Sequence, residues 1–369
     1  MASSSSVAAD EVYARQLLPS KRGYPLFIPE PSTTLPPQYV GRGVDIGDVG
    51  IIMDGSFFFV FSVCAAADDP VNRLGVPDGF QRFHPNEWLL SKYPNMHKKG
   101  SELTSSSIKK HKTAVEGGVK ENELLHIPAG INVGYTIKSA FSEAAVLNMP
   151  DGASSVDYRG LKELRSYAMR NGESWYEFIN DKLGLEAPNG SLHLVTGCDK
   201  STTWGIASVS HGSSSNTIAL RFTAAQSVQA SASYSFSWET DCPAFVRTGP
   251  DLGDDDSLPQ NQCLFVRGLK IRVRDNAVVR QLKGAVKVES TQDMTPGSIS
   301  SARRSNSFPG TSSSSRLSSK SSSSSRSSSG HQDLEDTPNT SDDEWSSDEE
   351  DLDHKHEVKR SPYSITVCS

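Results

Sequence analysis

The sequence predicts an α+β protein, in which a mainly antiparallel β-sheet domain with a few helices is followed by a disordered C-terminal tail. Between residues 192 and 274, short segments suited to strands follow one another through short links, which favours antiparallel neighbours. Helical spacing of apolar residues stands out in only two segments, which begin near Leu161 and Ser174. The tail, residues 291–369, is dominated by serine and acidic residues, which cannot build a core.

The composition divides the 369 residues into three parts. Residues 1–10 are predicted to be a disordered lead, residues 11–290 a single globular domain, and residues 291–369 a disordered tail. The tail has 19 serines among the 32 positions of 298–329, and its acidic part, 333–353, carries 11 acidic residues. Residues 10–290 have 29 basic and 31 acidic residues, so no basic face indicates nucleic-acid binding.

The domain begins with a proline-rich segment and a β-hairpin. Six prolines lie between Pro19 and Pro37, and proline favours neither helices nor central strands, so this stretch is predicted to be an extended strap packed on the core through LFI at 26–28. Asp54-Gly55 separates two apolar runs, which is a typical hairpin signal. Apolar residues in both alternating positions of 57–63 predict burial on both faces of the second strand.

The middle of the domain has weaker patterns. A short helix is predicted near residues 87–92, a polar exposed loop over residues 98–123, and a strand pair over residues 123–130 and 131–139. Two helices follow, one from Leu161 capped by Asp157, the other from a capping box at Ser174 with a stop at Gly184. Further strands are predicted at 192–198, 204–210, 217–225, 230–239 and 262–274.

The segment TGCDKST, at residues 196–202, invites a phosphate-loop interpretation that fails. That motif needs a glycine before the lysine, and here Asp199 precedes Lys200. The segment is therefore predicted to be a turn between two strands, with Asp199 and Ser201 binding backbone donors.

No other motif indicates chemistry. The histidines and cysteines show no metal-ligand spacing, and the cysteines are predicted to be small buried residues such as Cys198, Cys242 and Cys263. No catalytic residue, cofactor site or metal site is predicted, so an enzymatic activity has no support. The first residues lack the apolar run of a signal peptide, and no segment is long and apolar enough for a membrane helix. A cytoplasmic location is expected, with nuclear entry left open.

Residues 217–239 form two segments that could pair as an amphipathic β-hairpin. One face is predicted to carry the apolar side chains and the other the hydroxyl-rich side chains. The apolar face comprises Ile218, Leu220, Phe222, Tyr234, Phe236 and Trp238. This face packs on the domain's own core in the first interpretation, and enters lipid as a transmembrane hairpin in the second.

The tail carries sequence patterns that protein kinases recognise. Arg304 lies three residues before Ser307, acidic residues follow Ser341 and Ser347, and Ser361 precedes a proline. These four serines are predicted phosphorylation sites, and kinases are therefore expected partners.

Three segments carry a resemblance: GYPLFIPEP, GVDIGDVGIIMDGSFFFVF and LHLVTGCDKSTTWGIASVS. They resemble segments of proteins from mushroom-forming (basidiomycete) fungi, over roughly residues 11–275. That group has no established activity, so the resemblance implies a shared domain without a catalytic site. In architecture alone, the chain is also similar to gasdermin-like pore-forming domains.

The sequence therefore supports two functions. The first is a non-enzymatic intracellular binding domain for a protein partner, with a phosphorylatable regulatory tail. The second is a latent membrane-acting protein that uses the hairpin at 217–239, and membrane contact is expected only in this second case.

Overall fold

The structure of the protein is a computed structural model. It describes residues 8–111, 131–137, 143–210, 218–226, 234–240, 244–250 and 258–299. The chain divides into two compact units, Met1–Gly310 and Thr311–Ser369. Every described residue belongs to the first unit.

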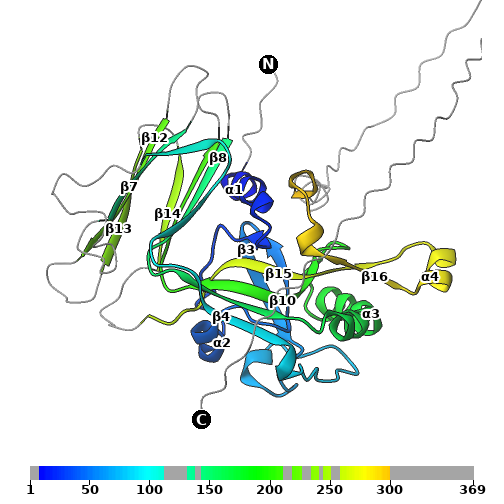
Figure 1. The fold of residues 1–369 in the computed structure, drawn as a ribbon. Coiled ribbons are helices and arrows are strands. Elements are labelled where there is room, and N and C mark those ends of the chain that lie inside the picture. Colours follow the sequence, from blue (N-terminus) through cyan, green and yellow to red (C-terminus); the bar gives the residue numbers. More distant parts are fainter. Residues whose placement is uncertain are drawn as a thin grey trace, which may run out of the picture. The chain divides into compact units, whose positions relative to one another are not determined.

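Eight strands form the largest sheet, and every recorded pairing in it is antiparallel (Figure 1). The strands are β1 (Tyr24–Pro25), β2 (Asp48–Met53), β3 (Ser56–Ser62), β4 (Leu90–His97), β9 (Ala153–Tyr158), β10 (Leu192–Ser201), β15 (Gln262–Val273) and β16 (Val286–Ser290). The long strand β10 holds this sheet together, since it pairs with β15 along one edge and with β2 and then β9 along the other.

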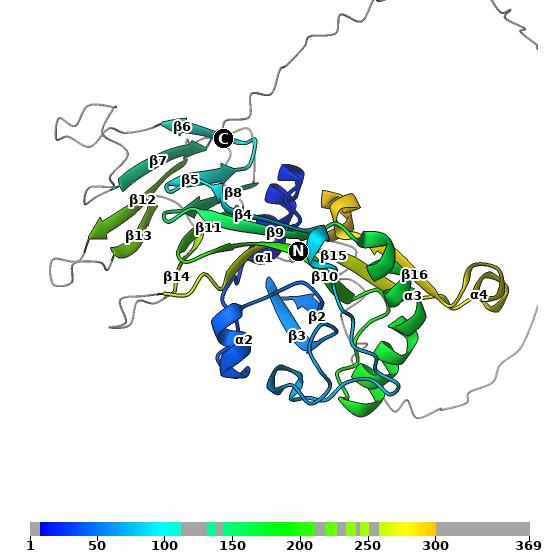
Figure 2. The same cartoon turned by 60° about the horizontal axis from the view of Figure 1, so that its bottom comes forward.

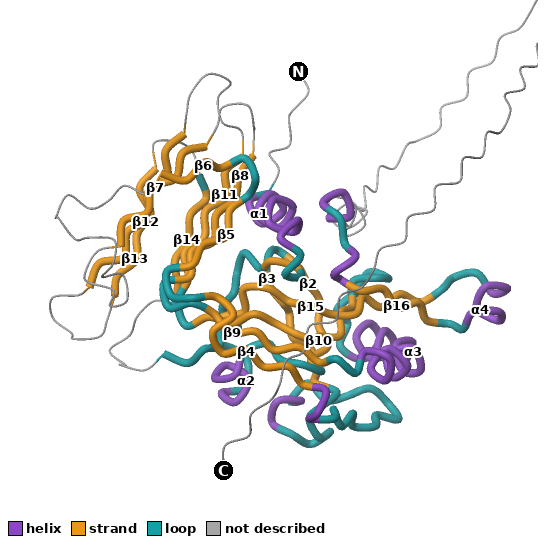
Figure 3. Tube along the Cα trace, viewed as in Figure 1, coloured by secondary structure: helices purple, strands orange, loops and turns teal. Residues whose placement is uncertain are grey.

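Two four-stranded sheets form a β-sandwich (Figure 3). One has the order β14-β11-β8-β5, with β5 (Ser101–Thr104), β8 (Glu143–Met149), β11 (Trp204–Ser210) and β14 (Phe245–Gly249). The other has the order β13-β12-β7-β6, with β6 (Ile108–His111), β7 (Ile131–Ile137), β12 (Ile218–Gln226) and β13 (Tyr234–Thr240). All their pairings are antiparallel, so the predicted α+β class with mainly antiparallel sheets is confirmed.

Four α-helices are described: α1 (Ala9–Leu17), α2 (Pro37–Arg42), α3 (Leu161–Glu177) and α4 (Ala277–Lys283). Helix α1 packs against β8 and β11 on the face opposite the sandwich interior, through Tyr13 and Leu17 (Figure 2). Helix α3 covers the large sheet, where Trp175 meets Phe61 edge to face at 5.7 Å between ring centroids. Because both faces of β8 and β11 are covered, these strands are apolar in both alternating positions.

The hairpin and the strap are where the sequence predicts them. Strands β2 and β3 are joined by Asp54 and Gly55, whose φ angles of 47° and 78° are those a tight hairpin turn requires. Within the strap, β1 pairs with β15, and the backbone N–H of Leu26 donates to the carbonyl of Leu264 at 3.0 Å. The Leu26 side chain is fully buried, so the strap contributes to the core.

The two helices predicted from Leu161 and Ser174 are a single helix, α3, which a π-turn extends to Lys182. Ser174 caps nothing: its hydroxyl donates to the carbonyl of Asn171 at 2.9 Å. Gly172 lies inside the helix. Because it has no side chain, the helix packs closely against Ile271 at this position. The predicted stop at Gly184 is correct, as its φ of 65° ends the helical segment.

Other predicted boundaries also change. The polar loop at 98–123 contains two strands, β5 and β6, which tolerate polar residues because each lies at the edge of its sheet; residues 112–123 lie outside the description. The predicted helix at 87–92 is a 3₁₀ turn, Glu87–Leu89, followed by β4.

The chain ends of the predicted domain shift as well. Helix α1 begins at Ala9, inside the segment predicted as a disordered lead. At the other end, order continues beyond residue 290, because Ile299 packs against Ala14 and Leu18.

Candidate functional site

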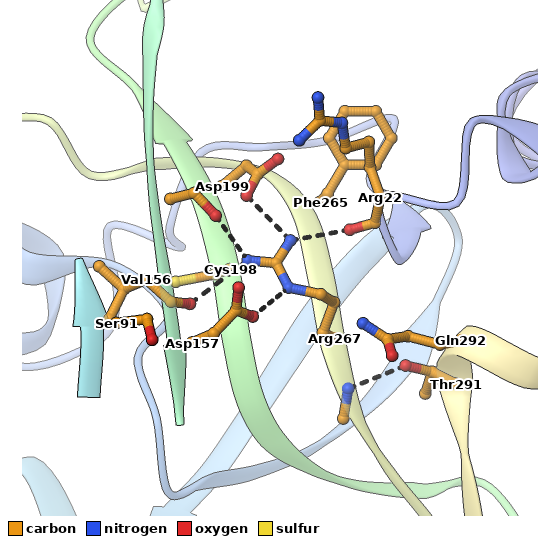
Figure 4. Close-up of polar contacts among 12 residues, drawn as sticks. Arg22, Ser91, Val156, Asp157, Cys198, Asp199, Phe265, Arg267, Thr291 and Gln292 are labelled. Carbon is orange, nitrogen blue, oxygen red and sulfur yellow. Dashed lines mark hydrogen bonds and ion pairs between the residues drawn. The ribbon is translucent and has the colours of Figure 1, made fainter. Parts of the chain in front are cut away.

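A buried arginine lies at the centre of the largest polar cluster inside the eight-stranded sheet (Figure 4). Arg267, on β15, donates through Nε to Asp157 Oδ1 on β9 at 2.5 Å and through Nη1 to Asp199 Oδ1 on β10 at 2.8 Å. Its Nη2 donates to Ser155 Oγ at 3.0 Å. The guanidinium also donates to the carbonyls of Arg22 and Val156, at 2.8 and 3.3 Å. One side chain therefore joins three strands and the strap.

Asp199 has a second partner, His97, at the end of β4. Asp199 Oδ2 and His97 Nε2 lie 3.2 Å apart, within hydrogen-bond distance. Burial would raise the pKa of Asp199, but the hydrogen bond with His97 and the charge of Arg267 outweigh it and lower that pKa below its usual value. Asp199 is 0% exposed, so an ionised carboxylate is stable here only because of these partners.

The burial and mutual hydrogen bonding of these side chains indicate the role of the cluster. A histidine paired with a carboxylate can act as a general base, but Arg267, Asp199 and His97 are all buried and their polar atoms hold one another. The cluster therefore cross-links β4, β9, β10 and β15, and is structural. The prediction of a turn at TGCDKST is wrong, because this segment belongs to β10 up to Ser201 and Asp199 binds side chains instead of backbone donors.

Two of the described cysteines are buried inside the large sheet. Cys198 and Cys263 are buried, as predicted, and Cys242 lies outside the described residues. A hydrogen bond with Cys198, together with burial, raises the pKa of Cys263 well above its usual value, so the thiol stays protonated. Within the described ranges, no three His, Cys, Asp or Glu side chains are placed to hold a metal ion.

The described part of the apolar face predicted for residues 217–239 packs in the interior of the β-sandwich. Leu220 and Phe222 on β12 are 1% and 2% exposed, and they pack with Val146 and Ala207 of the facing sheet. The register pairs Phe222 with Trp238 across the β12–β13 hairpin, where their ring centroids lie 5.0 Å apart. The predicted alternation and pairing are thus present in the structure.

The structure describes the other members of this face only in part. Phe236 is partly buried and stacks on Phe222 at 5.9 Å. Ile218 and Tyr234 lie at the ends of β12 and β13, and their side chains are outside the description. The predicted phosphorylation sites are outside it as well: Ser307, Ser341, Ser347 and Ser361.

The opposite face of this hairpin is open to solvent. Arg221, Ser237 and Glu239 are exposed there, and Arg221 Nη1 lies 3.5 Å from Glu239 Oε2. Strand β13 is the last of its sheet, so its pairing partner is β12 alone among the described strands. None of the helices in the described ranges is long and apolar enough to cross a lipid bilayer.

One large aromatic side chain is almost entirely exposed to solvent. Trp88 is 94% exposed, although tryptophan usually contributes more to burial than any other residue type. Its backbone is nevertheless held: the amide of Trp88 donates to Asn86 Oδ1 at 3.0 Å, and the amide of Arg159 donates to the carbonyl of Leu89 at 2.7 Å. The indole is therefore presented to solvent by an anchored turn.

Helix α3 begins two residues after Arg159, whose amide binds the Trp88 turn. The helix begins at Leu161, three residues after Tyr158 of β9, which pairs with Leu90 next to the Trp88 turn. Leu161 and Met169 are both exposed. Residues 161, 165 and 169 are four apart, so Arg165 lies between the two apolar side chains on one side of the helix. We define the Trp88 surface by its exposed members Trp88, Arg159, Leu161, Lys162, Arg165 and Met169.

Sequence reasoning missed both the buried cluster and the Trp88 surface. The partners of Arg267 are distant in the chain, and Trp88 belongs to no periodic pattern. The signal that was available at Trp88 is the asparagine two residues earlier, since such a side chain favours a local turn over a helix.

The comparisons with known proteins give no further guide. The chain matches no protein-family model and no curated protein.

Proposed function

We propose that this chain is a non-enzymatic binding protein that engages a protein partner through the Trp88 surface. The observation that carries the proposal is the exposure of Trp88, at 94%, on a turn whose backbone is hydrogen-bonded on both sides. Tryptophan is the residue type most enriched among the side chains that dominate protein interfaces. An anchored turn also loses little conformational entropy on binding, which favours affinity.

The surroundings of Trp88 suit such a partner. Leu161 and Met169 are two further exposed apolar side chains, on the helix that follows Arg159, and Arg159, Lys162 and Arg165 are exposed basic side chains of the same segment. An apolar centre with a polar rim is the usual composition of a protein interface. We expect the partner to offer a pocket that accepts an indole ring. The serine-rich and acidic tail would then be a regulatory segment that kinases modify at Ser307, Ser341, Ser347 and Ser361, in an intracellular setting.

Affinity capture from cells, with full-length protein and quantitative mass spectrometry, tests the proposal. Trp88→Ala should lose one or more partners that the wild-type protein captures. The matched control is Phe245→Ala, which removes another aromatic ring that is exposed, on β14, and should retain them. Both variants should unfold at the wild-type temperature, because neither ring packs in the core. Identical captured sets for the wild type and Trp88→Ala would contradict the proposal.

The second candidate is a latent membrane-acting protein that releases the β12–β13 hairpin. Its support is the location of β13 at the edge of its sheet, together with the apolar and polar faces of the hairpin. Release would require Leu220 and Phe222 to leave the sandwich core, where both are buried. The binding function needs no such rearrangement, so we rank it first.

Dye release from phosphatidylserine-containing vesicles by the full-length protein tests the second candidate. Phe236→Asp places a charge on the face that would contact lipid and should abolish release. Ser237→Asp places the same charge on the opposite, exposed face and should not. Absence of dye release by the wild type over a range of pH and lipid composition would remove the candidate.

A further inference from the structure

The β15–β16 hairpin carries a short helix at its end. The chain leaves β15 after Val273 and returns at Val286 through α4, and Figures 1 and 2 show α4 at the far end of this hairpin, beyond α3. Val278 and Leu282 on α4 are 65% and 77% exposed, which makes them the most exposed aliphatic side chains among the described residues. They are four residues apart and therefore share one face of the helix.

This exposure belongs to an ordered helix. At its start, Asn276 Oδ1 accepts hydrogen bonds from the backbone amides at the first turn, including that of Val278 at 3.0 Å. At its end, Arg274 Nη1 donates to the carbonyls of Lys283 and Gly284 at 2.9 and 2.8 Å. Both ends are therefore capped, and the two apolar side chains are held outward at a defined position.

The hairpin behind this tip is basic. Residues 270–290, which we call the arm, carry six basic and two acidic residues, a net charge of 6 − 2 = +4. The basic residues are Lys270, Arg272, Arg274, Arg280, Lys283 and Lys287, and the acidic ones are Asp275 and Glu289. Arg280 forms an ion pair with Glu173 of α3, so the local excess is +3 when that carboxylate is included.

We propose that the arm is a docking element for anionic phospholipid membranes. Val278 and Leu282 enter the boundary between headgroups and acyl chains, and the exposed cations Arg272 and Lys283 contact the phosphates and carboxylates of the headgroups. The proposal is independent of the Trp88 surface and of the β12–β13 hairpin, because it requires neither a protein partner nor any rearrangement of the sheets.

The small apolar tip and the positive charge of the arm favour a membrane over a protein partner. A stable protein interface buries about 800 Å² on each side, whereas α4 at the far end of the hairpin exposes two aliphatic side chains. Two aliphatic side chains are a small contact area, which suffices for reversible interfacial binding when basic residues add attraction to anionic lipid. The positive charge of the arm is complementary to such a surface.

Vesicle co-sedimentation of the full-length protein tests the proposal. The wild type should sediment with phosphatidylcholine–phosphatidylserine vesicles and not with phosphatidylcholine vesicles, and added salt should weaken binding. Val278→Ser/Leu282→Ser removes the apolar tip without changing charge and should lower the partition coefficient about tenfold or more. Arg272→Gln/Lys283→Gln removes two charges and should lower it severalfold on anionic vesicles.

The matched control is Met53→Ser, which removes an exposed apolar side chain at the distant β2–β3 turn and should bind as the wild type does. Far-UV circular dichroism and the unfolding temperature should match for all variants, since no buried side chain changes. Failure of the wild type to bind anionic vesicles would overturn the proposal, as would binding unaffected by the change at Val278 and Leu282. Loss of self-association in the same variant, without vesicle binding, would assign the tip to a contact between copies instead.

Discussion

The eight-stranded sheet and the β-sandwich are both antiparallel, but their interiors are stabilised in different ways. Four strands of the large sheet meet at an ion cluster, in which Arg267 holds Asp157 and Asp199 and Asp199 holds His97. The interior of the sandwich is apolar, and its rings, such as Phe222 and Trp238, pack on aliphatic side chains of the facing sheet. Among the described residues, no buried charged side chain lies on a strand of the sandwich.

Because of this difference, the two interiors should respond differently to the loss of a single side chain. An apolar core loses stability in proportion to the volume removed, whereas an ion cluster without one partner leaves a buried charge behind. The large sheet should therefore be more sensitive to single polar changes and to pH. The sandwich should be sensitive to the size of its side chains.

Arg267→Met should have the largest effect on stability. It would remove the arginine charge from beside two carboxylates, one of them fully buried, and should lower the free energy of unfolding by about 4 kcal/mol in urea denaturation. The control, Arg221→Met, breaks the exposed ion pair with Glu239 on the sandwich and should cost less than about 0.5 kcal/mol. Equal losses from the two variants would contradict the contrast between the regions.

Phe222→Ala should have the next largest effect. The ring is 2% exposed and contacts both Phe236 and Trp238, so its removal leaves a cavity between the sheets and should cost about 3 kcal/mol. The loss should be the same at pH 5 and pH 7, because no titratable group contributes to the described core of the sandwich. Urea denaturation at the two pH values measures it, and a loss that changes with pH would show that the interiors are coupled.

The sequence predicts the features that depend on residues close together in the chain, and misses those that depend on distant residues. The Asp54-Gly55 hairpin, the proline-rich strap and the alternation over residues 217–239 depend on local conformation and period, and all three are present in the structure. The cluster at Arg267 depends on partners 68 to 245 positions away in the chain, which no spacing in one sequence brings together.

Local signals also mislead where tertiary packing decides. The pattern at Ser174 is that of a capping box, yet the packing of Gly172 against Ile271 favours one continuous helix. The Trp88 surface was missed because an isolated tryptophan has no period from which its exposure could be read.

The pH dependence of the large sheet should be the smallest of the three effects. His193, on β10, is buried next to Lys270, and burial followed by the charge of Lys270 lowers its pKa to about 4. Because the folded protein favours the neutral ring, this stability is complete above the unfolded pKa of about 6.5 and is lost as the pH falls toward 4. At pH 5 the loss should be about 2 kcal/mol relative to pH 7. His193→Asn should remove this dependence from urea denaturation curves at pH 7 and pH 5. Parallel losses in the wild type and the variant would assign the pH sensitivity to a group other than His193.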